Sequence, residues 1–169
     1  MTIKIGEKLP EATLSESTEF GEACPISPKN VSVTEASKGK KVVIFGLPGA
    51  YTPTCSAKHV PGYLANLDKL KKAGVDEVWC ISVNDGFVMA AWGKDQGAIG
   101  KVRMMGDGSA DFAKKLGLEL DLNGAGMGLR MQRFSLLAED GVVKKLNFES
   151  GPKFEVSDAG TMLKQLGAA

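Results

Sequence analysis

The chain has 169 residues, of which 43% are hydrophobic and 24% are charged, and its formal net charge is +1 at pH 7. These values are ordinary for a globular protein, so we expect a single domain over residues 1–169, with neither nucleic acid nor a membrane as partner. No apolar run approaches the ~18–20 residues of a membrane span, and the first residues lack the apolar core of a signal peptide, so we expect a cytoplasmic protein.

Strands and helices alternate along the first two thirds of the chain. Apolar runs rich in β-branched and aromatic residues predict strands, whereas apolar residues at helical spacing predict helices. In chain order these patterns predict short strands and loops over residues 1–31, a buried strand at 42–47, a helix at 54–72, a second buried strand at 77–83, a helix at 87–94, a strand at 101–105 and a helix at 107–116.

The last third ends in a hairpin and a helix. Residues 119–128 hold three glycines and an asparagine, which predicts a loop. Asp140 and Gly141 separate two apolar runs, at 134–138 and 142–148, and such a pair is a strong hairpin signal. A helix is expected at 156–166. This order of elements predicts an α/β fold with a central mixed β-sheet flanked by helices.

Three cysteines are too few for a disulfide scaffold, and their number is odd. No CxxC pair exists and His59 is the only histidine, so we expect no metal and no cofactor. Cys80 lies inside an apolar strand and is expected to be a small buried hydrophobe. Cys24, in a proline-rich segment, is expected to be an incidental free thiol.

Cys55 has unusual neighbours, because it begins a helix directly after a buried strand. The first N–H groups of a helix are unpaired and carry positive potential, which stabilises a thiolate, the reactive form of cysteine. Thr52 precedes Cys55 by one helical turn, so its hydroxyl is expected near the sulfur. Pro48 can wall the site, and Gly49 helps to fix the turn.

Acidifying a thiol gives a net rate gain of only about two- to three-fold at neutral pH, because nucleophilicity falls as ionisation rises. A fast enzyme therefore needs a further group near Cys55 that stabilises the transition state. Arg133, at the entrance to the strand at 134–138, and Arg130 are the candidates, although a solvated surface arginine is the alternative for each. His59, four residues after Cys55, could pair with it as in a nucleophilic Cys–His site, but it more plausibly orders the helix start.

The run Pro48-Gly-Ala-Tyr-Thr-Pro-Thr-Cys55 resembles the PxxxTxxC signature of peroxiredoxins, and its continuation through His59 to Gly62 resembles the peroxiredoxin 5 (type II) subfamily. The likeness covers nearly the whole chain. It implies a thioredoxin-like fold and a homodimer, with Tyr51 in place of a phenylalanine associated with the dimer contact. The site residues that it implies are Cys55 as the peroxidatic cysteine, Thr52 bonding the thiolate and the peroxide, Pro48 and Gly49 around them, Arg133 as the family arginine, Arg130 as a second candidate, and Cys80 as a buried second cysteine.

The resemblance also bears on how the oxidised cysteine is recycled. Animal-type members carry a resolving cysteine after the hairpin, whereas residues 149–169 contain none and Ser157 stands about where it would fall. The chain is therefore similar to the bacterial and plant type, which implies glutathione with glutaredoxin, or thioredoxin, as reductant. Cys80 or Cys24 could still resolve the sulfenic acid if the helix start unwinds.

The leading functional hypothesis is a thiol peroxidase for hydrogen peroxide and small alkyl hydroperoxides. A thiol–disulfide exchanger would need a CxxC pair, and Thr52 occupies the place of the first cysteine. A redox sensor or interaction module that signals through Cys55 oxidation is the alternative from another class, and a holdase-like role is a third. Loss of turnover in Cys55→Ser would distinguish the peroxidase from the holdase.

Overall fold

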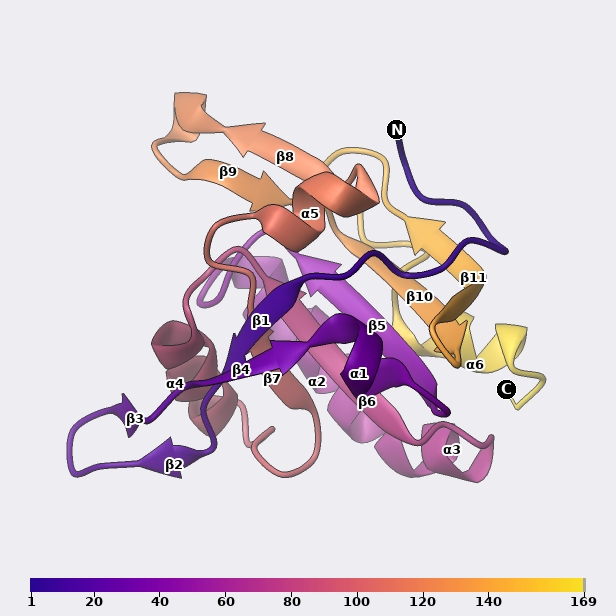
Figure 1. Cartoon of the computed structure of the whole chain (residues 1–169), viewed down its shortest axis with the longest axis horizontal. Coiled ribbons are helices and arrows are strands. Elements are labelled where there is room, and N and C mark those ends of the chain that lie inside the picture. Colours follow the sequence, from indigo (N-terminus) through magenta and orange to yellow (C-terminus); the bar gives the residue numbers. More distant parts are fainter. Residues whose placement is uncertain (169) are drawn as a thin grey trace.

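A computed structural model describes residues 1–168. Its main feature is a seven-stranded sheet in the order β11-β10-β5-β6-β7-β1-β4 (Figure 1). β5, β6 and β7 are parallel, whereas the strands beyond them on both sides run antiparallel. The strands are β1 Thr13–Glu16, β4 Lys29–Ser32, β5 Lys41–Leu47, β6 Glu77–Ser82, β7 Arg103–Gly106, β10 Phe134–Glu139 and β11 Val142–Phe148. The expected central mixed sheet is confirmed.

Two short hairpins and several helices complete the fold. One hairpin pairs β2 Glu19–Phe20 with β3 Pro25–Ile26, and the other pairs β8 Glu119–Leu122 with β9 Gly128–Met131. The helices are α1 Val33–Ser37, the π-helical turn η1 Cys55–His59, α2 Val60–Ala65, α3 Leu67–Lys72, α4 Gly86–Asp95, α5 Asp111–Leu116, the 3-10 turn η2 Asn123–Ala125 and α6 Ala159–Gln165. None of the helices formed by residues 1–168 has the length and apolar character that crossing a membrane requires.

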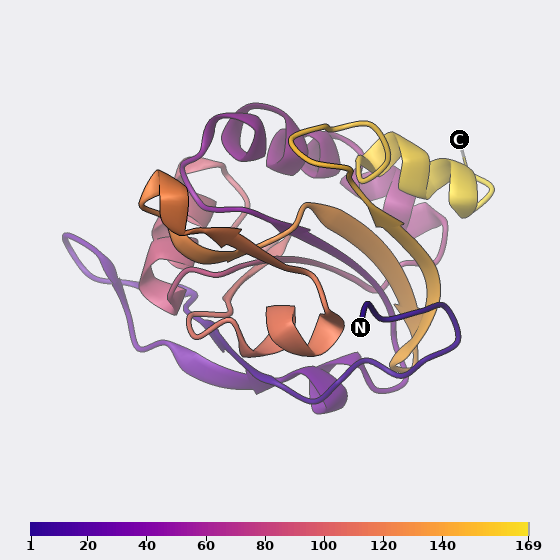
Figure 2. The same ribbon diagram turned by 90° about the horizontal axis from the view of Figure 1, so that it is seen from above.

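Side chains of β5 alternate between two cores, one on each face of the sheet. Val42 and Ile44 pack into the core covered by α1, α5 and the N-terminal segment. Val43 and Phe45 pack into the core covered by α2, α3, α4 and α6. Figure 2 shows the sheet between these two layers. Both faces are buried, which explains why the strand reads as a continuous apolar run.

The predicted loop at residues 119–128 is wrong, because most of these residues form β8 and η2 and the last begins β9. Gly124 and Gly126 lie at the turn of this hairpin, so glycines that suggested an irregular loop instead mark a reversal between strands.

By contrast, the predicted hairpin of β10 and β11 is confirmed. Asp140 and Gly141 have φ of +49° and +76°, the left-handed backbone that a tight hairpin turn requires.

Three helix boundaries differ from the prediction. The helix predicted at 54–72 is interrupted at Asn66, whose side-chain amide donates to the Gly62 carbonyl at 2.8 Å and competes with the helical ladder. The last helix begins at Ala159, because Asp158 caps it by accepting from the Thr161 N–H. The helix expected from Asp107 begins at Asp111, and α1 was not predicted at all.

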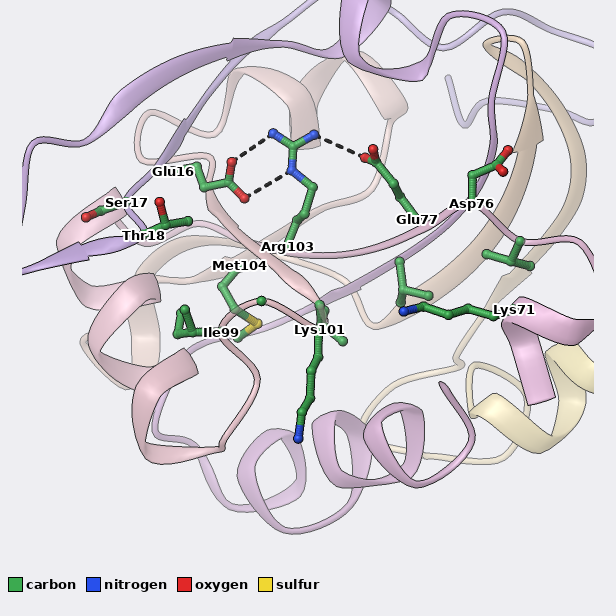
Figure 3. Close-up of a pocket in the computed structure, with 14 residues that line it drawn as sticks. Glu16, Ser17, Thr18, Lys71, Asp76, Glu77, Ile99, Lys101, Arg103 and Met104 are labelled. Carbon is green, nitrogen blue, oxygen red and sulfur yellow. Dashed lines mark hydrogen bonds and ion pairs between the residues drawn. The ribbon is translucent and has the colours of Figure 1, made fainter. Parts of the chain in front are cut away.

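A charged network closes the sheet at the end where β6 and β7 begin. The Arg103 guanidinium bonds both carboxylate oxygens of Glu16 and one oxygen of Glu77, at 2.8 to 3.1 Å (Figure 3). These groups line a cavity of about 330 Å³. β5 runs parallel to β6 and leads into Cys55 at the opposite end, so this network is remote from Cys55.

Candidate active site

The loop between β5 and η1 is fixed from the neighbouring strand. The Asn84 side-chain oxygen, just past the end of β6, accepts from the Ala50 N–H at 3.0 Å and from the Ser82 hydroxyl at 2.7 Å. Tyr51 has φ of +60°, and its hydroxyl donates to Asp95 at 2.6 Å. These contacts hold a left-handed residue that its own backbone preference would not favour.

Cys55 lies in the first part of a helical segment that has a widened turn. The Val60 N–H donates to the Cys55 carbonyl five residues back, so the chain from Cys55 to His59 is π-helical. Such turns often occur at functional sites. The side chains of Cys55 and His59 are both buried, and both contact the guanidinium of Arg133. Cys55 is 0% exposed, which favours a small reactant over a large substrate.

Arg133 reaches the sulfur from 78 residues away in the sequence. Its Nη2 donates to Cys55 Sγ at 3.1 Å, and its Nη1 lies 2.9 Å from His59 Nδ1. Arg133 is only 8% exposed, and among residues 1–168 no carboxylate forms an ion pair with it. A buried cation without a carboxylate is costly, and the polar contacts of this guanidinium are instead made with Cys55 Sγ and His59 Nδ1.

His59 is neutral in this environment. Burial, followed by the charge of Arg133, lowers the pKa of His59 from 6.5 to about 3. Because Nδ1 accepts from Arg133, the ring proton is on Nε2, which donates to the Ser157 carbonyl at 3.0 Å. His59 thus links Arg133 to the segment that carries Ser157, a connection that the expectation of a role at the helix start did not include.

The buried neutral histidine predicts a pH dependence of stability. Between pH 6.5 and about 3 the unfolded chain protonates His59 and the folded chain does not, so the free energy of unfolding falls as the pH falls. Relative to His59→Gln, the wild type should lose about 1.4 kcal/mol per pH unit below 6.5. Urea unfolding of both proteins at pH 7, 6 and 5 measures this, and parallel curves would contradict it.

Arg130 does not contact the sulfur. Its Nη1 donates to the Pro48 carbonyl at 3.0 Å and its Nε to the Met127 carbonyl at 2.8 Å, so it links β9 to the loop before Cys55. A Cβ added at Gly49 would lie 2.5 Å from Arg130 Nη1, so a larger residue there would displace the end of the arginine side chain. Arg130 and Gly49 therefore shape the loop rather than the sulfur's immediate surroundings.

Thr52 lies in the first helical turn, since its carbonyl accepts from the Ser56 N–H at 3.0 Å, but its hydroxyl does not make the expected bond. Its hydroxyl donates to the Gly49 carbonyl at 2.8 Å, and among the bonds formed by residues 1–168 none joins it to Cys55. A hydroxyl has one proton, so the lone pairs of Thr52 Oγ1 remain available to accept. Thr52 can thus receive a hydrogen bond from a bound molecule while it braces its own loop.

The other two cysteines lie in different environments. Cys80 is buried in β6, as expected, and it packs in the same core cluster as Cys55. Burial, followed by the nearby Cys55, raises the pKa of the Cys80 thiol well above 9.0, although Arg133 partly opposes this shift. Cys24 is exposed near the β2–β3 hairpin, and all three cysteines are free thiols.

Sequence reasoning missed Glu149, Phe154 and the Ser157 carbonyl. Phe154 packs against the Arg133 guanidinium at 5.7 Å and against the His59 ring at 5.0 Å, measured to ring centroids. Glu149 holds the segment that carries Ser157. Their partners are mostly backbone groups and an arginine far away in the chain, so no local residue pattern signals them.

The comparisons with known proteins agree with this geometry. A family model described as Redoxin matches residues 4–163. Peroxiredoxin-2B of Arabidopsis thaliana is 46% identical over 164 residues, which cover 97% of this chain and 98% of the relative. Reduced Prx3 of Vibrio vulnificus, solved in complex with H₂O₂, has a TM-score of 0.90 at 48% identity and covers 98% of this chain and 99% of its own.

A more distant structure gives the subfamily. Peroxiredoxin 5 from Alvinella pompejana has a TM-score of 0.83 at 30% identity, over 98% of each chain. The expected thioredoxin-like fold is confirmed by these peroxiredoxin structures. Given the family match, the close relatives and a cysteine held by a buried arginine, the chain belongs to the peroxiredoxins, in the type II or peroxiredoxin-5-like group, and is a thiol-dependent peroxidase.

Proposed function

We propose that Cys55 is the cysteine that peroxide oxidises, with hydrogen peroxide and small alkyl hydroperoxides as substrates. The 3.1 Å contact between Arg133 Nη2 and Cys55 Sγ carries this proposal. The thiolate attacks one peroxide oxygen, the S–O bond forms and the O–O bond breaks. The leaving oxygen takes a proton and departs as water or an alcohol, so Cys55 becomes a sulfenic acid.

The surrounding residues support this step in different ways. Arg133 supplies N–H donors beside both the sulfur and the developing charge on the leaving oxygen, where a preorganised donor is most effective. Thr52 Oγ1 accepts the peroxide O–H and so orients the attacked bond. Arg130 holds the carbonyl of Pro48, which supports our proposal that Pro48 and Gly49 form the wall beside them.

For the reductant we propose glutathione together with glutaredoxin. Cys80 is buried and Cys24 lies on a separate hairpin, so neither is placed to attack a sulfenic acid at Cys55 without rearrangement. A thiol from outside would instead displace water and form a mixed disulfide, which a second thiol reduces. Support also comes from residues 149–169, which contain no cysteine.

The proposed recycling predicts a specific oxidised product. After one equivalent of peroxide and excess glutathione, Cys55 should carry one glutathione, and glutaredoxin should sustain turnover better than thioredoxin. Intact-mass spectrometry with peptide mapping measures the adduct. An intramolecular disulfide between Cys55 and Cys80 or Cys24 would contradict it.

A homodimer and a cytoplasmic location are also proposed. Tyr51 and Phe87, next to the Cys55 loop and at the start of α4, are 56% and 49% exposed, and exposed aromatic side chains of this kind are common in interfaces. Sedimentation equilibrium at micromolar concentration should give twice the chain mass, and a monomer mass would contradict the dimer. Cell fractionation tests the location.

A further inference from the structure

Arg133 is held by a chain of contacts that begins outside the Cys55 helix. His59 Nδ1 accepts from Arg133 Nη1 at 2.9 Å, while His59 Nε2 donates to the Ser157 carbonyl at 3.0 Å. The ring can make both bonds only as the Nε2-protonated neutral tautomer. The position of the Ser157 carbonyl therefore determines where the imidazole lies, and the imidazole determines where one arm of the guanidinium lies.

Glu149 holds the Ser157 carbonyl in place. One oxygen of its carboxylate accepts from the Ser157 N–H at 2.8 Å, the Ser157 hydroxyl at 2.6 Å and the Val156 N–H at 3.0 Å. Both oxygens accept from the Glu155 N–H at 3.0 and 3.1 Å. Glu149 is 5% exposed, so these backbone donors take the place of water around the carboxylate.

The carboxylate is ionised in this setting. Burial opposes its charge, but the Ser157 hydroxyl and the three backbone N–H groups outweigh burial and hold the pKa of Glu149 below 4.5. The backbone of Glu149 is also bonded directly to Arg133, since the Glu149 N–H donates to the Arg133 carbonyl at 2.9 Å. The loop after β11 is therefore connected to Arg133 at two places. One is the backbone of Glu149, and the other is the Ser157 carbonyl, which acts through the His59 ring.

We propose that Glu149 is a positioning residue that holds Arg133 on the Cys55 sulfur. It acts through the Ser157 carbonyl and the His59 ring, while Phe154 of the same loop packs against the guanidinium. This inference rests on the proposed role of Arg133 at Cys55. Because Arg133 has no carboxylate partner within residues 1–168, this loop and His59 are what orient its second nitrogen.

A double-mutant cycle tests the proposal. Glu149→Gln should lower the second-order rate constant of Cys55 oxidation by hydrogen peroxide about 10- to 100-fold, as small misplacements of a catalytic group do. In an Arg133→Met background the same change should alter the rate less than two-fold, since no guanidinium remains to be positioned. Stopped-flow tryptophan fluorescence follows the reaction, because Trp92 Nε1 donates to Ser56 next to Cys55.

Glu77→Gln is the matched control. Glu77 is likewise a carboxylate with several donors and a lowered pKa, but it lies with Arg103 at the start of β6, the end of the strand away from Cys55 (Figure 3). The Glu77→Gln protein should have a lower free energy of unfolding than the wild type and the same rate constant of Cys55 oxidation. A Glu149→Gln protein that reacts like the wild type, or that loses activity equally with and without Arg133, would overturn the inference.

Two further outcomes keep the test decisive. If Arg133→Met alone leaves the rate unchanged, the proposed function of Arg133 fails, and the inference fails with it. If Glu149→Gln does not fold, His59 variants replace it: His59→Gln keeps an acceptor and a donor and should stay within a few-fold of wild type. His59→Leu keeps neither, and should lose the 10- to 100-fold expected of Glu149→Gln. Equal rates for the two His59 variants would overturn the inference.

Discussion

Cys55→Ser should abolish the thiol-dependent consumption of peroxide, with a fall of roughly 10⁴-fold or more, as expected when a nucleophile is removed. A serine hydroxyl in the same place keeps the hydrogen bond to Arg133 but cannot be oxidised by peroxide to a sulfenic acid. The change is small in volume, and the buried site offers the hydroxyl both a donor and helical backbone. A coupled assay with glutathione and glutaredoxin measures the rate.

The other two cysteines provide the controls for this result. Cys80→Ala and Cys24→Ser should retain the rate of the first oxidation step, since neither side chain bonds to the sulfur, Arg133 or His59 within residues 1–168. A Cys55→Ser protein that still turns over peroxide would contradict the peroxidase account of Cys55. Full retention would instead assign the peroxide chemistry to a group other than Cys55.

Arg133→Met should slow the oxidation of Cys55 about 10²- to 10³-fold, the usual effect of removing one preorganised donor from a transition state. The loss combines a missing counter-charge for the thiolate and a missing donor to the leaving oxygen. Arg133→Lys keeps the charge but not the planar fork, so its rate should fall between those of Arg133→Met and the wild type, because a single ammonium nitrogen replaces the two guanidinium nitrogens that reach His59 and Cys55. The rate constant of a single turnover with hydrogen peroxide measures each effect.

Arg103→Met separates this chemistry from the general cost of losing a partly buried arginine. Arg103 bonds Glu16 and Glu77 at the remote end of the sheet, so its loss should lower the stability of the fold and leave the oxidation rate unchanged.

Arg130→Met should give a smaller loss of rate than Arg133→Met, since Arg130 holds the loop carbonyl of Pro48 rather than the sulfur. Equal losses for Arg130 and Arg133 would contradict their assigned roles.

The sequence predicted the parts of the site that a local pattern can carry. The position of Cys55 at a strand-to-helix turn follows from a buried apolar run, two prolines and a helical repeat, and the structure places it there. Arg133 was predicted at the entrance to a strand, and that placement is confirmed. Residue type alone favours a solvated surface position for Arg133. Only the resemblance to the family favours a position at the active site.

The remaining parts depend on contacts between distant segments. His59 and Ser157 are 98 residues apart, and their bond uses a backbone carbonyl, which every residue possesses. The bonds of Glu149 are likewise mostly to backbone N–H groups. The β8–β9 hairpin resembles a loop in sequence because its strands are short and its turn is rich in glycine, yet β9 is the element that delivers Arg130 to the Cys55 loop.

The central claim is that the sulfur beside Arg133 is the one that peroxide oxidises. The most direct measurement treats the reduced protein with one equivalent of hydrogen peroxide in the presence of dimedone, which traps sulfenic acids, and maps the label by peptide mass spectrometry. The account predicts a label on Cys55, and a much slower appearance of that label in Arg133→Met. A label on Cys24 or Cys80 with Cys55 still a free thiol would contradict it.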